Sequence, residues 1–216
     1  MTAGRVAAPG GVAAVAAALR AALCPDQIIE DRQQLRTYEC DGLAHHRVVP
    51  ALAVLPETAA QCVAAVAACA AAGVPFVARG SGTGLSGGAL PRADGVLIVT
   101  SRLRRVLEVR PDDERAVLEP GVVNLDVTRA ATPHGYFYAP DPSSQQICSV
   151  GGNVAENSGG AHCLKYGFTA HHVTGLRVVT PDGELVTLGG LAPDPPGYDL
   201  LGAFVGSEGT LGLAVE

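Results

Sequence analysis

The stretch that decides the fold is Val74-Pro-Phe-Val-Ala-Arg-Gly-Ser-Gly-Thr-Gly-Leu-Ser-Gly-Gly-Ala-Leu-Pro91, in which an apolar segment runs into a glycine-rich loop. Five of the nine residues from Gly80 to Gly88 are glycine. A loop with so few side chains exposes its backbone N–H groups, and glycines with positive φ can arrange these groups as a concave anion cradle. The stretch therefore predicts a phosphate-binding loop at the end of a strand.

Two common nucleotide-binding folds are excluded by what surrounds this loop. The run Gly82-Thr-Gly-Leu-Ser-Gly87 matches G-x-G-x-x-G, but the dinucleotide-binding fold also needs a helix that opens directly at the loop. Here a strand-like run, Gly95–Thr100, follows so soon that a crossover helix of about ten or more residues has no room. The pattern G-x-x-x-x-G-K-[ST] does not occur in the sequence, so a P-loop is excluded as well.

Composition and charge narrow the class of protein. Of the 216 residues, 48% are hydrophobic and 17% are charged, a balance typical of folded domains. A net charge of −6 with scattered arginines argues against a nucleic-acid interface, which needs a clustered basic face. The six cysteines have no C-x-x-C or metal-finger spacing, which favours free thiols in a reducing cytoplasm and no iron–sulfur cluster. No run is apolar enough for a membrane-spanning helix.

Strands and helices alternate around the loop. A strand at Ala51–Leu55 is followed by the predicted helix Ala59–Ala72, with Thr58 as its N-cap and Gly73 at its end. This β–α–β unit brings the loop to the carboxyl end of a strand, where ligands commonly bind. We expect further strands at 95–100, 106–110, 116–119, 173–180 and 185–188, and a helix at 124–132 capped by Asn124. The order predicts one α+β unit in two lobes.

A second unusual stretch is Cys148-Ser-Val-Gly-Gly-Asn-Val-Ala-Glu-Asn-Ser-Gly-Gly-Ala161, which follows Pro140-Asp-Pro-Ser-Ser144. Two Gly-Gly pairs flank Asn153 and Asn157. Such a segment can lie flat against a planar polar ring and offer it N–H and amide groups without steric bulk. The alternative interpretation is a loop in which the glycines and asparagines serve only to form turns.

Several separated motifs carry a family resemblance. Those that resemble the FAD-binding domain of the vanillyl-alcohol-oxidase/p-cresol-methylhydroxylase (VAO/PCMH) flavoprotein superfamily are Ala78–Ala89, Pro140–Ser144, Gly151–Gly160 and Gly206–Gly212. Tyr38-Glu-Cys-Asp-Gly42 and His162-Cys-Leu-Lys-Tyr-Gly167 are similar to the FAD-containing D subunits of bacterial glycolate oxidases (glycolate dehydrogenases), which are related to D-lactate dehydrogenases. The resemblance runs from about Asp31 to the end of the chain.

The resemblance implies a two-lobed α+β FAD-binding domain of the VAO/PCMH type. We expect an N-terminal helical extension at residues 1–30 and the FAD-binding domain at 31–216, with one lobe at about 31–100 and the other at about 101–216. In this family a substrate-binding cap domain follows, and we expect it to be absent from this chain. Because the sequence ends at Glu216 in what reads as mid-strand, we expect a chain truncated before the cap domain.

The resemblance also implies contacts with noncovalent FAD at matching positions. The pyrophosphate would be held by Arg79, Gly80, Ser81, Gly82, Thr83, Gly84, Leu85 and Gly88. The flavin and ribityl regions would be lined by Pro140, Asp141, Ser143, Ser144, Ser149, Gly151, Gly152, Asn153, Ala155, Asn157 and Gly160. The nucleotide would lie near Glu208, Gly209 and Leu211. No catalytic residue or metal ligand is assigned, because the base and the metal-binding histidines of the family belong to the cap domain.

The activity implied is that of an FAD-linked oxidoreductase acting on CH–OH groups. A hydride would pass from C2 of a small 2-hydroxy acid, glycolate or D-lactate, to flavin N5, and electrons would continue to partner subunits, an Fe–S subunit among them, or to a quinone. Such a protein would be cytoplasmic or held at the inner membrane through its partners. One alternative is an FAD-binding or assembly module without turnover of its own. A cell-wall precursor reductase is disfavoured by the motifs at 38–42 and 162–165.

Overall fold

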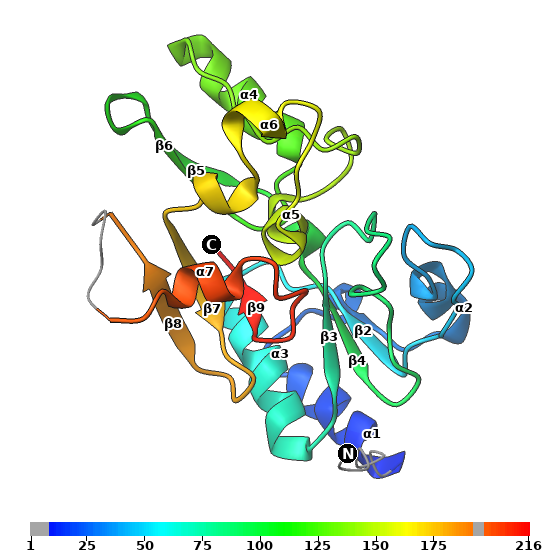
Figure 1. Ribbon diagram of the computed structural model, residues 1–216. Helices are drawn as coiled ribbons and strands as arrows, with labels where there is room; N and C mark the ends of the chain where they lie inside the picture. Colours follow the sequence, from blue (N-terminus) through cyan, green and yellow to red (C-terminus); the bar gives the residue numbers. More distant parts are fainter. Residues whose placement is uncertain (1–8, 192–196) are drawn as a thin grey trace.

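The first sheet positions the glycine-rich loop. The computed structural model describes residues 9–191 and 197–216, so residues 1–8 of the predicted N-terminal extension lie outside the described residues. In the order β1-β2-β4-β3, the sheet consists of β1 (Ile28–Ile29), β2 (Leu52–Val54), β4 (Val96–Val99) and β3 (Phe76–Arg79) (Figure 1). Both β2 and β3 pair with β4 in parallel, and β1 pairs with β2 antiparallel.

The connection from β3 to β4 is unusual for a parallel pair. Such pairs need a crossover of about a dozen or more residues, which is usually a helix. Here the crossover is the glycine-rich loop itself, because residues 80–95 contain no helix or strand. The prediction that no helix opens at this loop is confirmed, and the loop is free to present its backbone rather than its side chains.

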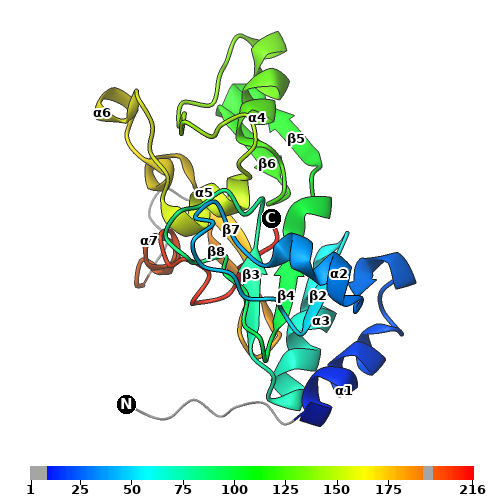
Figure 2. The same ribbon diagram turned by 90° about the vertical axis from the view of Figure 1, so that its right-hand side faces the viewer.

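Helices cover both faces of this sheet. On one face lies α3 (Ala59–Ala72), with α1 (Pro9–Leu19) packed beside it, and Ile98 is fully buried there. The other face carries α2 (Arg32–Leu35) (Figure 2). Leu97 is buried on that face together with Leu35 of α2. Successive strand residues point to opposite faces, so a sheet covered on both sides needs continuous apolar strands such as β2 and β4.

Among the described residues, the remaining strands form two more sheets, and four further α-helices accompany them. The sheets are the hairpin β5 (Val106–Arg110) and β6 (Arg115–Leu118), and the antiparallel set β8 (Leu185–Gly189), β7 (Gly175–Val179) and β9 (Leu213–Ala214). The helices are α4 (Asn124–Ala131), α5 (Val150–Glu156), α6 (Cys163–Tyr166) and α7 (Leu200–Phe204). Because α3 contacts both β4 and β7, the first and third sheets share one hydrophobic core, which includes Val66 and Val179.

The predicted ends of α3 are confirmed. Thr58 lies in extended conformation before the helix, and its Oγ1 accepts a hydrogen bond from Gln61 N at 3.2 Å. Gly73 ends the helix with a φ of 63°, a left-handed conformation that glycine adopts without steric cost.

Two local predictions are wrong. Asn124 is not an N-cap: Val123 occupies that position, and Asn124 is the first residue of α4 with its side chain engaged elsewhere. The stretch 150–156, predicted as a flat or looped segment, is the helix α5, which ends at Asn157 with a φ of 48°. Tertiary contacts overcome the poor helix propensity of its two glycines, since Val150 N and Gly151 N donate to carbonyls of the segment before α4.

Removing the N-cap of α3 tests its contribution to stability. We expect Thr58→Ala to lower the free energy of unfolding by about 1 kcal/mol, because Gln61 N–H loses its acceptor. Thr58→Ser keeps a hydroxyl and should retain most of that stability. Urea unfolding followed by circular dichroism measures both variants, and an equal loss in the two would show that the cap bond is not the cause.

Candidate functional site

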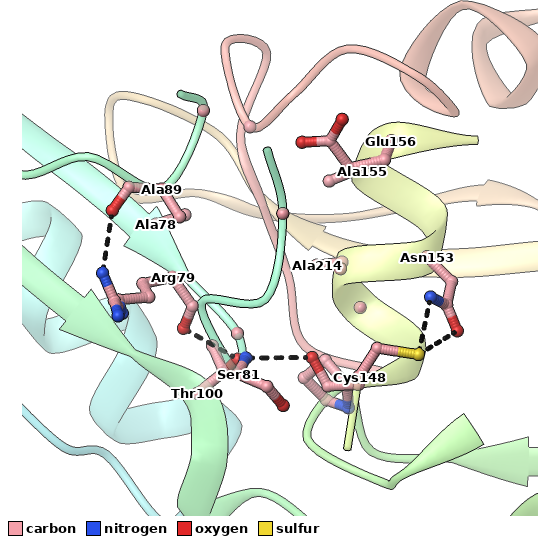
Figure 3. A pocket seen from close by; sticks show the side chains of 18 of the residues that line it. Ala78, Arg79, Ser81, Ala89, Thr100, Cys148, Asn153, Ala155, Glu156 and Ala214 are labelled. Atoms are coloured by element: carbon pink, nitrogen blue, oxygen red, sulfur yellow. Dashed lines mark hydrogen bonds between the residues drawn. The ribbon is translucent and has the colours of Figure 1, made fainter. Parts of the chain in front are cut away.

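The predicted motifs meet around a pocket. It is formed by the loop after β3, the first turns of α5 and the segment that leads into β9, with about 140 Å³ of open volume (Figure 3). Predicted cofactor-binding residues that line it are Arg79, Gly80, Ser81, Gly82, Thr83, Gly84, Gly88, Ser144, Ser149, Gly151, Gly152, Asn153, Ala155, Glu208 and Gly209. Three stretches far apart in the sequence therefore contribute to a single site.

Other predicted residues lie outside the lining: Leu85, Pro140, Asp141, Ser143, Asn157, Gly160 and Leu211. Asn157 ends α5, and its Oδ1 accepts from Ala170 N at 2.9 Å. Leu85 and Leu211 are exposed at 67% and 51%. Their contacts with a cofactor stay predictions.

Sequence reasoning did not find several residues of the lining: Ala78, Ala89, Thr100, Pro120, Cys148, Glu156, Ser158, Phe204, Gly212, Leu213 and Ala214. Cys148, Glu156 and Ser158 fall inside a stretch already singled out for its glycines, and Gly212 closes a recognised motif. Thr100 and Pro120 carry no local signal, because only contacts in the folded chain bring them to the pocket: Thr100 Oγ1 donates to Arg79 O at 3.3 Å, and Pro120 O accepts from Gly151 N of α5 at 2.7 Å.

Arg79, the last residue of β3, supports the loop from within. Its Nη1 donates to Cys40 O at 2.8 Å and to Ala89 O at 3.2 Å. The guanidinium therefore joins the end of the glycine-rich loop to the segment around Cys40. Burial lowers the pKa of Arg79, but a guanidinium titrates so far above neutrality that it keeps its charge. Gly42 N adds a tie to Gly84 O at 3.0 Å. Gly82 has a φ of 68°, and a Cβ there would overlap the Arg79 guanidinium.

The loop and α5 approach each other closely at Gly80. Ser81 N donates to Ser149 Oγ at 3.3 Å, and a Cβ on Gly80 would overlap that same oxygen. The start of α5 also contacts the 120–122 segment, since Gly151 N donates to Pro120 O at 2.7 Å. The glycines at these positions therefore let three backbone segments pack at short range.

Two residues of the pocket lining near the glycine-rich loop carry carboxylates, Glu156 of α5 and Glu208 before β9. Glu156 Oε2 accepts from Ser86 Oγ at 2.5 Å, and Glu156 Oε1 lies near the backbone of Gly84 and Gly88. Glu208 has a left-handed φ of 54°, and its N–H donates to Ala155 O at 2.8 Å. Ionised carboxylates only accept hydrogen bonds, so this side suits ligand hydroxyl groups, whereas the loop N–H groups suit an anion.

The segment from Pro140 to His162 is closed by a side-chain contact outside the pocket. Asp141 Oδ2 contacts His162 Nδ1 at 2.5 Å, and Asp141 Oδ1 accepts from His162 N at 3.2 Å. The hydrogen bond from His162 holds the pKa of Asp141 below its usual range. Gly160 packs against Asp141 so tightly that a Cβ would overlap its carbonyl oxygen. These residues shape the predicted flavin segment without lining the pocket.

Within residues 9–191 and 197–216, no three His, Cys, Asp or Glu side chains gather in a group that could hold a metal ion. In the same part of the chain, no helix combines the length and the apolar character needed to cross a membrane. All six cysteines are free thiols. Burial raises the pKa of Cys62 and of Cys69 to about 12, so these two thiols stay protonated at neutral pH.

Comparison with known proteins gives relatives over most of the chain. Glycolate oxidase subunit GlcD of Escherichia coli K12 is 52% identical over 190 residues, which are 88% of this chain and 38% of that protein. Glycolate oxidase subunit GlcD of Bacillus subtilis is 39% identical over 193 residues, 89% of this chain and 41% of that protein. The chain therefore spans about two fifths of the length of these curated relatives.

The comparison with solved structures also finds similarity over most of the chain. A structure of alkyldihydroxyacetonephosphate synthase superposes with a TM-score of 0.81 at 25% identity, covering 96% of this chain and 38% of that one. The family model described as "FAD binding domain" matches residues 50–189, more than half of the chain and most of the pocket lining. Sequence, fold and site together show that the chain belongs to the FAD binding domain family.

Proposed function

We propose that the pocket binds FAD noncovalently, with the pyrophosphate on the glycine-rich loop. The supporting observation is a backbone cradle from which side chains are excluded: a Cβ at Gly80 or Gly82 would overlap a neighbour, while Gly84 and Gly88 face the pocket. Arg79 would act by fixing the loop, since its guanidinium already donates to two carbonyls. The phosphate ligands would then be backbone N–H groups.

The remaining walls fit the other parts of the cofactor. We assign the flavin and ribityl regions to the lining residues Ser144, Ser149, Gly151 and Gly152, and the nucleotide to the side of Glu208 and Gly209. Bound FAD would supply an acceptor for a hydride from C2 of the substrate. The FAD-binding domain would comprise residues 31–216 in two lobes, after an N-terminal extension.

We propose that the complete protein oxidises a small 2-hydroxy acid, glycolate in the first place and D-lactate as the alternative. Support comes from the relatives named as glycolate oxidase subunits. The word subunit in those names also supports partner chains that take up the electrons, an Fe–S subunit among them, or a quinone as acceptor. We place the protein in the cytoplasm, with any attachment to the inner membrane made through such partners.

Anaerobic spectroscopy of the purified chain tests the assignment. We expect the protein reconstituted with FAD, after gel filtration, to retain a flavin spectrum with its maxima in the visible region. We expect flavin to be released on denaturation, as noncovalent binding requires. Addition of glycolate should bleach the visible band if this chain carries the complete site. A protein that stays colourless in excess FAD would overturn the proposal.

A second candidate is a cofactor-binding module without turnover. The observation that favours it is the scarcity of free bases in the pocket lining, which contains no histidine or lysine and one of whose carboxylates, that of Glu156, already accepts a hydrogen bond from Ser86 Oγ. FAD retention without bleaching by glycolate or D-lactate would support this candidate. Glycolate-dependent reduction of a dye by the chain alone would exclude it.

A further inference from the structure

A buried pair of side-chain amides lies beside the pocket. Asn124, at the start of α4, is 1% exposed, and Asn153 of α5 is 2% exposed. Asn124 Nδ2 donates to Asn153 Oδ1 at 2.9 Å and to Pro140 O at 3.1 Å (Asn153 is labelled in Figure 3). Asn153 Nδ2 in turn donates to Cys148 Sγ at 3.3 Å and to Ser158 Oγ at 3.4 Å. The amide nitrogens of both residues thus donate to two protein groups each.

This pair joins the two segments that we assign to the flavin. Pro140 begins the 140–144 segment, and Asn153 belongs to α5, whose first residues line the pocket. The backbone at the start of α4 adds two ties to the intervening chain, Asn124 N to Cys148 O and Leu125 N to Gln145 O, both at 3.0 Å. The start of α4 therefore sets the distance between the 140–144 segment and α5, although Asn124 does not itself line the pocket.

The burial of the Asn124 side-chain amide beside the pocket needs a physical explanation. A buried amide is tolerated only when its hydrogen bonds are made, and a hydrophobic side chain of similar volume would avoid that requirement. Satisfied polar networks fix a single arrangement of the elements that they connect, because any slip leaves a donor or acceptor unpaired. The hydrogen bonds of Asn124 fix the arrangement of the 140–144 segment and α5 in this way.

We propose that Asn124 is a positioning residue of the flavin site. Its carboxamide holds Pro140 and Asn153 at one spacing, so that the 140–144 segment and α5 present a fixed surface to the isoalloxazine ring. The inference rests on the proposed binding of FAD. It adds that Asn124 acts on the flavin site through Pro140 and Asn153. A residue with this role should affect how the flavin is held, in addition to how stable the protein is.

The chain offers a matched control beside the first sheet, away from the pocket. Gln27 is also 1% exposed, and its Nε2 donates to Gln61 Oε1 at 3.1 Å and to Leu55 O at 3.2 Å. The two amides thus have the same burial, the same number of donated bonds and the same kinds of acceptor. Neither Gln27 nor its two partners line the pocket. Gln27→Leu therefore reports the loss of stability alone.

The experiment compares FAD binding by the full chain and by the variants Asn124→Leu and Gln27→Leu. Titration of flavin fluorescence gives the Kd, visible circular dichroism of the bound flavin reports its environment, and thermal unfolding reports stability. For Asn124→Leu we expect the Kd for FAD to rise about tenfold, which corresponds to about 1.4 kcal/mol of binding free energy. We also expect an altered visible dichroism band. For Gln27→Leu we expect a fall in Tm at least as large, because Gln27 Oε1 also accepts from Cys24 N and Gln61 Nε2, with Kd within about twofold of the original protein and an unchanged band.

A milder variant keeps the test decisive if Asn124→Leu does not fold. Asn124→Ala leaves space for water to satisfy Pro140 O and Asn153 Oδ1, and it should show the same altered dichroism band with a smaller change in Kd. The inference is overturned if Asn124 variants bind FAD with the original Kd and band, or if Gln27→Leu changes both equally. Failure of the unaltered chain to bind FAD overturns the proposed function itself, and this inference with it.

Discussion

Gly82→Val is expected to weaken FAD binding more than about 100-fold, equivalent to about 2.7 kcal/mol or more. Gly82 has a φ of 68°, a conformation that a β-branched residue adopts only with strain. The new Cβ would also overlap the Arg79 guanidinium, which is held by Cys40 O and Ala89 O. Displacing Arg79 removes the support of the loop, so we expect a lower Tm as well as the loss of flavin.

Gly84→Val is the matched substitution in the same loop. Gly84 has no left-handed φ, and the nearest atom to its Cβ would be Glu156 Oε1 at 3.6 Å, an ordinary contact. The protein without flavin should therefore keep its Tm, whereas the added side chain fills the pocket and prevents close approach of a phosphate. FAD titration and thermal unfolding of both variants separate the two causes. Normal flavin occupancy in both would exclude the loop as the pyrophosphate site.

Gly80→Ala is expected to weaken FAD binding about 30-fold, or about 2 kcal/mol. The methyl group would overlap Ser149 Oγ, which is buried with its residue at 2% exposure and accepts from Ser81 N. Ser149 must rotate or α5 must move away from the loop, and either change alters the spacing of two pocket walls. Retention of FAD during gel filtration gives a first reading, and fluorescence titration gives the Kd.

A second substitution should restore part of that loss. In Gly80→Ala/Ser149→Ala the overlapping oxygen is gone, and the new methyl group lies 3.6 Å from the Ser149 Cβ position, an ordinary contact. Ser149→Ala alone removes the acceptor of Ser81 N and should weaken binding modestly. The double variant should therefore bind FAD more tightly than Gly80→Ala, a coupling that a double-mutant cycle measures. Additive losses would show that steric overlap with Ser149 is not the reason for glycine at position 80.

The central features of the site could be predicted because they depend on residues that are neighbours in the sequence. A glycine-rich loop after an apolar strand, followed too soon by another strand, indicates a backbone cradle in any context. Thr58 and Gly73 likewise act through their own neighbours, and the ends of α3 follow from them. The motif at 206–212 was identified by resemblance, and Glu208 and Gly209 do line the pocket.

The features that escaped prediction depend on distant parts of the chain. Asn124 has the residue type and position of an N-cap, but its acceptors are Pro140 and Asn153, which only the folded chain brings close. The helix α5 contains two glycines that local propensity disfavours, and it forms because its first N–H groups meet carbonyls at Val122 and Pro120. In both cases tertiary hydrogen bonds outweigh the local preference.

The loop that joins β3 to β4 also has a thermodynamic consequence for ligand binding. Residues 80–95 would form a long unstructured connection if they were free, but Gly42 N holds Gly84 O and the Arg79 side chain holds Ala89 O. These ties divide the loop into short sections, and the entropy of ordering each section is lost when the protein folds. An anion then meets a preorganised cradle, so little of its interaction free energy is consumed in immobilising the chain.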